Sequence, residues 1–404
     1  MKITKIDVMK FDPYDNDKGF ACHFVGIRVF TDTGLYGDGE VALDYGCASN
    51  AAFGMLQDLC PLVIGMDPLD TEVIWEKLFR STFWAQSPGP VVTGGMSAID
   101  LACWDIKGKY FGVPVYKLLG GKLRNKLRAY ASQLQFGWDM EKWEKTGMWT
   151  VDYEQKTLED YVNVSKKAVS EGYNAIKIDF FTIDEDGRYF ENTERLGLLD
   201  PRYRDVIERR IAAVREAVGP NVDIIMENHS FTDAQSAVQL GKIAEKYNIF
   251  YFEEPNTPAP KTTKFIADSL SLPIAHGERI YTRWQFAPYF ENGSIHLIQP
   301  DLGTCGGLTE GKKICDMAYI YDVGVQCHVC ASPLSTNYAL HLECTLPNFV
   351  IHEHHVQYLT PEVGVVAKYN LQPVNGYFTV PDLPGFGNEW SEWALEHCKK
   401  VTIE

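Results

Sequence analysis

Acidic side chains and a histidine stand where apolar segments end in the second half of the sequence. The segment NVDIIMENHSFTD (221–233) runs apolar to Glu227 and places His229 two residues later. Residues i and i+2 of a strand point to the same side, so both side chains would face one place. Two later apolar segments end in Glu253 and Glu278. Carboxylate oxygens suit Mg²⁺, which keeps positions open for substrate oxygens, and the three glutamates are therefore candidate Mg²⁺ ligands.

Each of these glutamates taken singly has a structural interpretation, since a carboxylate can also pair with a lysine or an arginine. Three of them at consecutive segment ends are costly to bring together without a compensating ion, which favours the metal site. Glu254 follows Glu253 directly and should point to the opposite side of the strand. We expect Glu254 to have a structural partner.

Asp301 and His328 end two further apolar segments, and they could form a catalytic pair. An aspartate that is hydrogen-bonded to one imidazole nitrogen fixes the tautomer and leaves the other nitrogen basic. Such a pair can also be purely structural, but its place beside a candidate metal site favours a general base. His229 would then be a second titratable group, displaced from His328 around the site.

The elements that must position these residues alternate between strands and helices from about residue 127 onward. Helical patterns lie between the strands, one beginning with the capping-box sequence TLED (157–160) and others covering 232–247 and 308–322. Apolar strands alternating with helices indicate a parallel sheet, and eight of them over roughly 230 residues predict a (β/α)₈ barrel. The expected strands are 127–132, 174–179, 222–227, 249–254, 273–278, 295–301, 324–328 and 349–353.

A doubly wound open sheet is the competing topology, and no GxGxxG motif follows a first strand to support its dinucleotide-binding form. The N-terminal part is instead typical of an α+β unit. Residues 24–40 indicate a hairpin with turn residues at 32–34. Residues 97–112 predict a helix in which Ser97 is the N-cap and Gly112 marks the end.

Composition narrows the class of partner. The chain has 404 residues, 38 basic and 54 acidic, which gives a net charge of −16 and a pI near 5.1. This balance argues against nucleic acid and anionic membranes. We also expect neither a signal peptide nor a membrane span, because the sequence has no suitable apolar stretch. Ten cysteines without a framework spacing are typical of reduced thiols in a cytoplasmic protein.

Several motifs resemble one known family in their order along the chain. They are AIDLACWDIKGKYFGVPVYKLLGG (98–121), EEP (253–255), GE (277–278) and QPDLGTCGG (299–307). Together they resemble the enolase superfamily, in its mandelate-racemase-like branch. The resemblance implies an α+β capping domain and a modified (β/α)₇β barrel. It also implies that Glu227, Glu253 and Glu278 bind Mg²⁺, that Asp301 and His328 form a dyad, and that homo-oligomers are common.

The resemblance also implies domain boundaries. The capping domain would comprise residues 1–125 with the C-terminal tail 380–404, and the barrel would comprise residues 126–379.

Within that branch the sequence looks most like the acid-sugar dehydratases. The ENH motif at 227–229 is similar to the Asp-x-His of galactonate and mannonate dehydratases, where the acid binds metal and the histidine helps the hydroxyl leave. Lys177-x-Asp179 departs from the Lys-x-Lys of the racemases, which weakens a two-base racemase. Glu227 replaces the more usual aspartate, and CHVCASP (327–333) is not the sequence typical of galactonate dehydratases. The sugar acid therefore stays open.

The resemblance implies dehydration of an aldonate such as galactonate, gluconate or mannonate. His328 would remove the C2 proton, metal charge would stabilise the enediolate, and His229 would protonate the leaving C3 hydroxyl, giving a 2-keto-3-deoxy acid. Lys177 would help to neutralise the substrate carboxylate or the intermediate.

Four residues are weaker candidates for contacts with the substrate. Asp179 and Glu353 could contact sugar hydroxyls, stabilise the intermediate or be structural. His23 and Trp84 fall in loops of the capping domain that could contact the distal carbons, although a structural role is favoured for both.

Two alternatives remain open at the level of sequence. An epimerase or a cycloisomerase of a sugar acid would use the same enediolate. A protein that binds metal and sugar acid without turnover belongs to a different class, but binding alone does not need His229.

Overall fold

An eight-stranded parallel barrel forms the larger part of the molecule. The computed structural model describes residues 1–12, 23–140 and 156–404. Within them the strand order is β10-β9-β8-β7-β6-β5-β4-β11, with every neighbouring pair parallel. A parallel bridge between Val325 and Phe349 joins the last segment back to the β10 side of the sheet. The barrel strands are β4 (Lys126–Ser132), β5 (Ala175–Ile178), β6 (Asp223–Glu227), β7 (Tyr251–Glu253), β8 (Ile274–His276), β9 (Leu297–Ile298), β10 (Gly324–Val325) and β11 (His352–His355).

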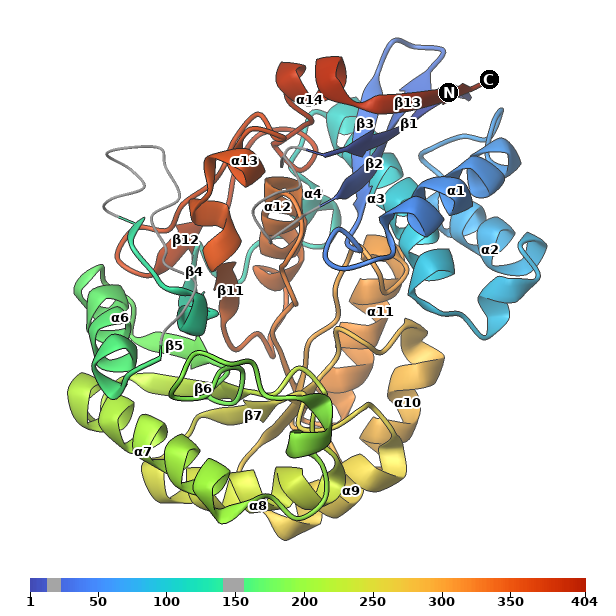
Figure 1. Cartoon of the computed structure of the whole chain (residues 1–404). Helices are drawn as coiled ribbons and strands as arrows, with labels where there is room; N and C mark the ends of the chain where they lie inside the picture. Colours follow the sequence, from blue (N-terminus) through green and yellow to red (C-terminus); the bar gives the residue numbers. More distant parts are fainter. Residues whose placement is uncertain (13–22, 141–155) are drawn as a thin grey trace.

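Helices follow the first seven strands and cover the outside of the barrel, as Figure 1 shows. The predicted (β/α)₇β architecture is confirmed, and the closed order excludes an open doubly wound sheet. All eight expected strands are present, and their ends differ from the predicted ranges by up to a few residues. The helices are α6 (Leu158–Ser170), α7 (Pro201–Val218), α8 (Ala234–Ala244), α9 (Pro260–Ser269), α10 (Thr282–Asn292), α11 (Gly307–Ile320) and α12 (Pro333–Glu343).

Local sequence explains where several of these helices begin. Thr157 and Asp160 form the predicted capping box of α6, in which each side chain accepts a hydrogen bond from the other residue's backbone N–H. Asp233 caps α8 through hydrogen bonds from the backbone N–H groups of Gln235 and Ser236. These caps satisfy backbone donors that the first turn leaves without partners. They fix the points at which the chain leaves the barrel mouth.

The capping part is an antiparallel sheet with helices packed beside it. Its strand order is β13-β1-β2-β3, so the C-terminal strand pairs with the N-terminal one and the two termini lie close together (Figure 1). The predicted hairpin is formed by β2 and β3, and Gly34 takes a left-handed conformation in its turn. The elements are β1 (Ile3–Phe11), β2 (Phe24–Thr31), β3 (Tyr36–Val41), β13 (Lys399–Ile403), α1 (Ser49–Leu59), α2 (Thr71–Ser81) and α3 (Pro90–Phe111).

The start predicted for α3 is wrong. The helix begins at Pro90, whose fixed φ suits a first turn, and Ser97 lies inside it. Ser97 donates its hydroxyl hydrogen to the carbonyl of Thr93 and accepts a hydrogen bond from the backbone of Gly306. Ser97 is of a residue type that often begins helices, but here it links the capping domain to the barrel instead. The predicted end is confirmed, because Gly112 is the left-handed C-cap.

Shorter elements complete the chain. A strand near the C-terminus, β12 (Tyr377–Thr379), pairs antiparallel with β4. The short helices are α4 (Val115–Leu118), α13 (Pro361–Gly364) and α14 (Glu392–His397). No helix in the three described ranges has an apolar stretch long enough to cross a lipid bilayer.

Candidate active site

A cavity of about 510 Å³ opens at the carboxyl ends of the barrel strands and is closed on one side by the loop after β3. That loop is held over the barrel because the backbone N–H of Ala42 donates to the carbonyl of Gly303. Chemistry in barrels of this kind takes place at this end of the strands. The acidic and imidazole groups in the lining are Asp44, Asp179, Glu227, His229, Glu278, Asp301, His328 and His355.

Three carboxylates meet beside the cavity, as predicted. Glu227 and Glu253 are register partners at the ends of β6 and β7, and Glu278 follows β8. One oxygen from each lies within 4.8 Å of the others. The Oε2 of Glu253 is buried without a hydrogen-bond partner among the described residues, and the Oε1 of Glu227 faces His229 Nε2 at 3.2 Å. A buried carboxylate oxygen without a donor fits a divalent cation, whose charge would offset the cost of placing the three groups together.

Lys177 lies among the carboxylates rather than in the lining of the cavity. Its Nζ is 2.6 Å from Glu253 Oε1, 2.8 Å from Glu353 Oε1 and 3.2 Å from Glu227 Oε2. Burial acts to lower the pKa of the ammonium, but the three carboxylates raise it well above its usual value. The structure thus places Lys177 as a fixed positive charge under the candidate metal ligands.

Glu353 also lies outside the lining. It accepts hydrogen bonds from the hydroxyl of Ser132 at 2.8 Å and from the backbone N–H of Val329 at 2.9 Å, besides its ion pair with Lys177. Its contacts are therefore structural, and they hold the start of the loop that carries His328.

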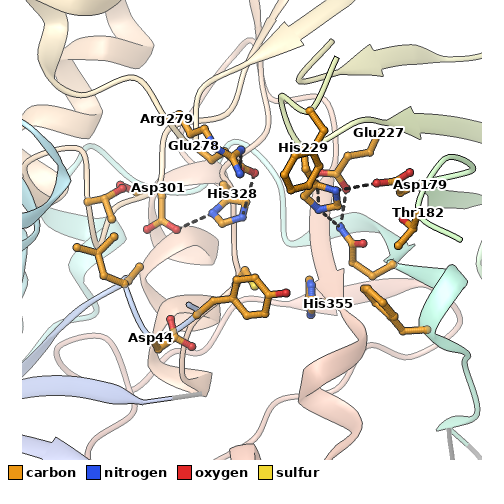
Figure 2. A pocket seen from close by; sticks show the side chains of 18 of the residues that line it. Asp44, Asp179, Thr182, Glu227, His229, Glu278, Arg279, Asp301, His328 and His355 are labelled. Carbon is orange, nitrogen blue, oxygen red and sulfur yellow. Dashed lines mark hydrogen bonds and ion pairs between the residues drawn. The ribbon is translucent and has the colours of Figure 1, made fainter. Parts of the chain in front are cut away.

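His328 and Asp301 form the predicted pair on one side of the cavity, as Figure 2 shows. His328 Nδ1 is 2.7 Å from Asp301 Oδ2, and His328 Nε2 is 3.3 Å from Glu278 Oε2. Asp301 Oδ1 accepts the backbone N–H of Gly303, which fixes the carboxylate. Burial acts to lower the pKa of His328, while Glu278, Asp301 and Glu353 outweigh it and raise the pKa to about 10.

A second imidazole–aspartate pair faces the first across the cavity (Figure 2). His229 Nδ1 is 3.0 Å from Asp179 Oδ2, and its Nε2 is 3.2 Å from Glu227 Oε1. His229 has a φ of +47°, an uncommon conformation that turns the chain sharply after β6. Asp179, a candidate for contacts with sugar hydroxyls, for stabilisation of the intermediate or for a structural role, lines the cavity and orients this histidine. Burial acts to lower the pKa of His229, but Glu227 and Asp179 raise it to about 9.

The negative charge of the carboxylate cluster raises the pKa values of both His229 and His328. Glu278 is 3.3 Å from His328, and Glu227 is 3.2 Å from His229. A divalent cation bound to these glutamates would cancel the negative charge that raises the imidazole pKa values. Its own charge would lower them further, since like charges disfavour the protonated form. A filled metal site would therefore bring both histidines toward the range in which they exchange protons at neutral pH.

Glu254 has the structural role expected of it. It is buried, takes a φ of +47° and accepts hydrogen bonds from Arg279 at 2.9 Å and from the hydroxyl of Ser230. Burial acts to raise its pKa, but His276, Arg279 and Ser230 lower it to about 2. The side chain of Arg279 also contacts Glu278, and it thereby links two neighbouring segments of the barrel mouth.

His23 and Trp84 do not line the cavity. His23 Nδ1 is 2.6 Å from Asp12 Oδ1, and its backbone N–H donates to the carbonyl of Asp44. Trp84 is 73% exposed and packs edge-on against Phe83. Among the described residues of the cap, those that reach the cavity lie in the loop after β3, which contains Asp44.

Sequence reasoning missed Gln133 and Arg195 in the lining. Gln133 follows β4 directly, and its Nε2 donates to Glu227 Oε2 at 2.5 Å and lies 3.1 Å from His229 Nε2. Gln133 follows the rule that strand ends face the site, but it is not ionisable, so a search for ionisable strand ends does not find it. Arg195 lies in the long connection between β5 and α7, where no periodic pattern points to the cavity.

Comparison with known proteins gives a consistent picture. A family model described as "Enolase C-terminal domain-like" matches residues 160–394. A second, described as "Mandelate racemase / muconate lactonizing enzyme, N-terminal domain", matches residues 20–120. A crystal structure of a member of the enolase superfamily from Salmonella Typhimurium is similar over 100% of both chains, with a TM-score of 0.93 and 47% sequence identity.

Two curated relatives have named activities. A D-galactonate dehydratase from Pectobacterium atrosepticum is 30% identical over 400 residues, which cover 97% of this chain and 93% of the relative. A D-mannonate dehydratase from Novosphingobium aromaticivorans is 29% identical over 403 residues, which cover 97% of this chain and 94% of the relative.

Proposed function

Because the chain belongs to the enolase superfamily, we propose that it is a Mg²⁺-dependent dehydratase that converts a sugar acid into a 2-keto-3-deoxy acid. The relatives that act on galactonate and mannonate support this class of substrate. The observation that carries the proposal is the pair of imidazoles, each oriented by an aspartate, on either side of a three-carboxylate cluster. Dehydration needs one base and one acid at neighbouring carbons, and this arrangement supplies both.

The residues divide the reaction between two sides of the cavity. His328 takes the proton from C2, and Asp301 holds the imidazole in the tautomer that leaves Nε2 free and then stabilises the protonated ring. His229, held by Asp179, gives a proton to the departing C3 hydroxyl. The resulting enol tautomerises to the 2-keto-3-deoxy acid, and water is released. Proton balance is kept, since one imidazole gains the proton that the other loses.

Glu227, Glu253 and Glu278 would hold Mg²⁺, and Lys177 fixes two of these side chains. When bound, Mg²⁺ supplies the positive charge that stabilises an enediolate. Without the cation, the three glutamates and the ammonium of Lys177 together carry a net negative charge. A divalent cation would offset this charge.

One observation favours a second function, epimerisation at C2. Two imidazoles face the cavity from opposite sides, and a two-base exchange of the C2 proton needs such an arrangement. Dehydration differs from it in consuming the C3 hydroxyl. The two functions can therefore be distinguished by the product that forms and by the incorporation of deuterium at C2.

The test is a library of aldonic and aldaric acids incubated in D₂O with the protein and Mg²⁺. We expect a 2-keto acid to form from at least one aldonic acid, with no activity after chelation of the metal. Deuterium at C2 of recovered acid with inverted configuration, and no keto product, would indicate the epimerase. Binding of an acid without either change would indicate a non-catalytic binding protein and would contradict the proposal.

A further inference from the structure

Arg195 is a buried cation in the wall of the cavity that the proposed reaction does not use. It lies at the end of a short 3₁₀ turn (Asn192–Arg195) in the connection between β5 and α7, and it is only 5% exposed. The same connection contributes Thr182 and Phe190 to the lining. A guanidinium that is buried in this way needs hydrogen-bond acceptors to offset its lost hydration.

The structure satisfies Arg195 only in part. Its Nη2 donates to the backbone carbonyls of Thr182 at 3.3 Å and Phe190 at 3.2 Å. Its Nε is buried with no hydrogen-bond partner among the described residues, and no described carboxylate lies within an ion-pair distance of 4.0 Å. The guanidinium packs over the ring of Phe231 at 4.9 Å. Arg279, the other arginine in the lining, is by contrast engaged by Glu254 and Glu278.

The direction of the bound substrate follows from the two histidines. C2 must lie near His328 and C3 near His229, so the chain runs from the His328 side of the cavity to the His229 side. Arg195 belongs to the second side, because its ring contact, Phe231, is two residues after His229. The carbons beyond C3 therefore extend toward the guanidinium.

The charge of the lining decides which oxygen Arg195 would meet. Two acidic side chains already act on the charge of Arg195, namely Asp179 in the lining and Glu194, its neighbour in the sequence. A second substrate carboxylate would add to this negative charge, whereas a hydroxyl accepts a hydrogen bond without adding any. A hydrogen bond from a charged donor to a neutral hydroxyl is strong enough to discriminate between substrates by about 10- to 100-fold.

We propose that Arg195 determines specificity by donating a hydrogen bond to a hydroxyl beyond C3, and thereby selects long-chain aldonic acids. This inference rests on the proposed function, because the reaction defines which end of the substrate reaches Arg195. Arg195 takes no part in the proton transfers. Its loss should therefore weaken the binding of acids that have distal hydroxyls and leave shorter acids unaffected.

The experiment measures binding separately from turnover. Calorimetry with Mg²⁺ is carried out on His328→Asn protein, with and without Arg195→Met, for two ligands. One is the aldonic acid that the unmodified protein converts fastest. The other is 2,3-dihydroxybutanoate, which has the C2 and C3 hydroxyls and none beyond. Arg202→Met, in which a 58% exposed arginine of α7 is replaced, is the control for loss of one positive charge.

We expect Arg195→Met to raise the Kd of the aldonic acid at least about 10-fold and that of 2,3-dihydroxybutanoate less than about 2-fold. An equal loss for both ligands would show a structural role for Arg195 and overturn the inference. A larger loss for the matching aldaric acid than for the aldonic acid would overturn the choice of a hydroxyl. If unmodified protein converts no sugar acid at all, the proposed function fails, whatever these affinities show.

Discussion

At the residue scale, the pairing of Asp179 with His229 changes the role that each has in the site. The motif Lys177-x-Asp179 departs from the Lys-x-Lys of the racemases, and the sequence left the role of Asp179 open. In the structure its Oδ2 lies 3.0 Å from His229 Nδ1. Asp179 and His229 follow the adjacent strands β5 and β6, just as Asp301 and His328 follow β9 and β10, so this pair too was predictable. The three glutamates were predictable because each ends a strand of its own.

Replacement of Asp179 by asparagine tests this positioning role. Asparagine keeps the shape of the side chain but cannot stabilise a protonated imidazole, so we expect kcat to fall about 10- to 100-fold with little change in KM. Asp186→Asn, at an 84% exposed side chain of the same connection, should leave both parameters unchanged. A rise in KM with unchanged kcat would show that Asp179 contacts the substrate instead.

Lys177 offers a second test at this scale, this time of stability. The ammonium is 1% exposed and contacts three carboxylates. Lys177→Met would leave these negative charges uncompensated, and we expect it to cost about 3–5 kcal/mol in the free energy of unfolding of the metal-free protein. Mg²⁺ should restore part of that loss. Urea unfolding with and without Mg²⁺ measures both effects, and equal losses under the two conditions would contradict the placement of the cation beside Lys177.

At the element scale, alternation of strands and helices predicted the barrel, and capping residues predicted the start of α6. The start of α3 was not predictable from capping preference alone. Ser97 is a residue of N-cap type whose hydroxyl is used inside the helix, and the partner that explains it, Gly306, is 209 residues away. The same limit applies to Arg195, since only the folded connection between β5 and α7 brings it to the cavity.

We expect His341 of helix α12 to be one of the buried histidines, with His354 and His355, that make the protein sensitive to acid. His341 is fully buried and accepts a hydrogen bond from the backbone N–H of Tyr116, and burial lowers its pKa to about 3. The unfolded chain binds a proton near pH 6.5, whereas the folded protein does not until about pH 3. The contribution of the neutral His341 imidazole to the free energy of unfolding is therefore complete above pH 6.5. It is lost by about 1.4 kcal/mol per pH unit as pH falls from 6.5 toward 3.

We expect His341→Gln to flatten the dependence of unfolding free energy on pH between 7 and 5 by about one proton, measured by urea unfolding. His397→Gln, at an exposed histidine of α14, should not flatten it. An unchanged slope for His341→Gln would show that this histidine is not the source of the acid sensitivity.

At the scale of the whole molecule, the cap and the barrel complete one cavity between them. The loop after β3 contributes Ala42, Leu43, Asp44 and Tyr45, and the other described residues of the lining come from the barrel. The resemblance in sequence implied this division into cap and barrel. The two residues of the cap that were candidates for substrate contacts, His23 and Trp84, do not line the cavity. The order of motifs along the sequence identifies the domains, whereas the loop residues that reach a cavity depend on how the two parts pack. The boundaries at residues 125 and 380 stay predictions.

Metal binding should stabilise the whole fold, because the cluster is formed only when three strands of the barrel are in register. A ligand that binds only the folded state adds about 2.7 kcal/mol when its concentration is 100 times its Kd. We expect Mg²⁺ to raise the Tm relative to protein in chelator, and Glu253→Gln to reduce the shift. A Tm shift that survives in Glu253→Gln, Glu227→Gln and Glu278→Gln alike would place the cation elsewhere.

The division of labour between the two histidines is tested most directly by exchange of the C2 proton in D₂O, measured by NMR on the best sugar acid from the library. His229→Asn should exchange C2 hydrogen for deuterium while forming little keto acid, because the base is intact and the acid is missing. His328→Asn should do neither. Exchange that persists in His328→Asn would contradict the account, since a different group would then remove the proton.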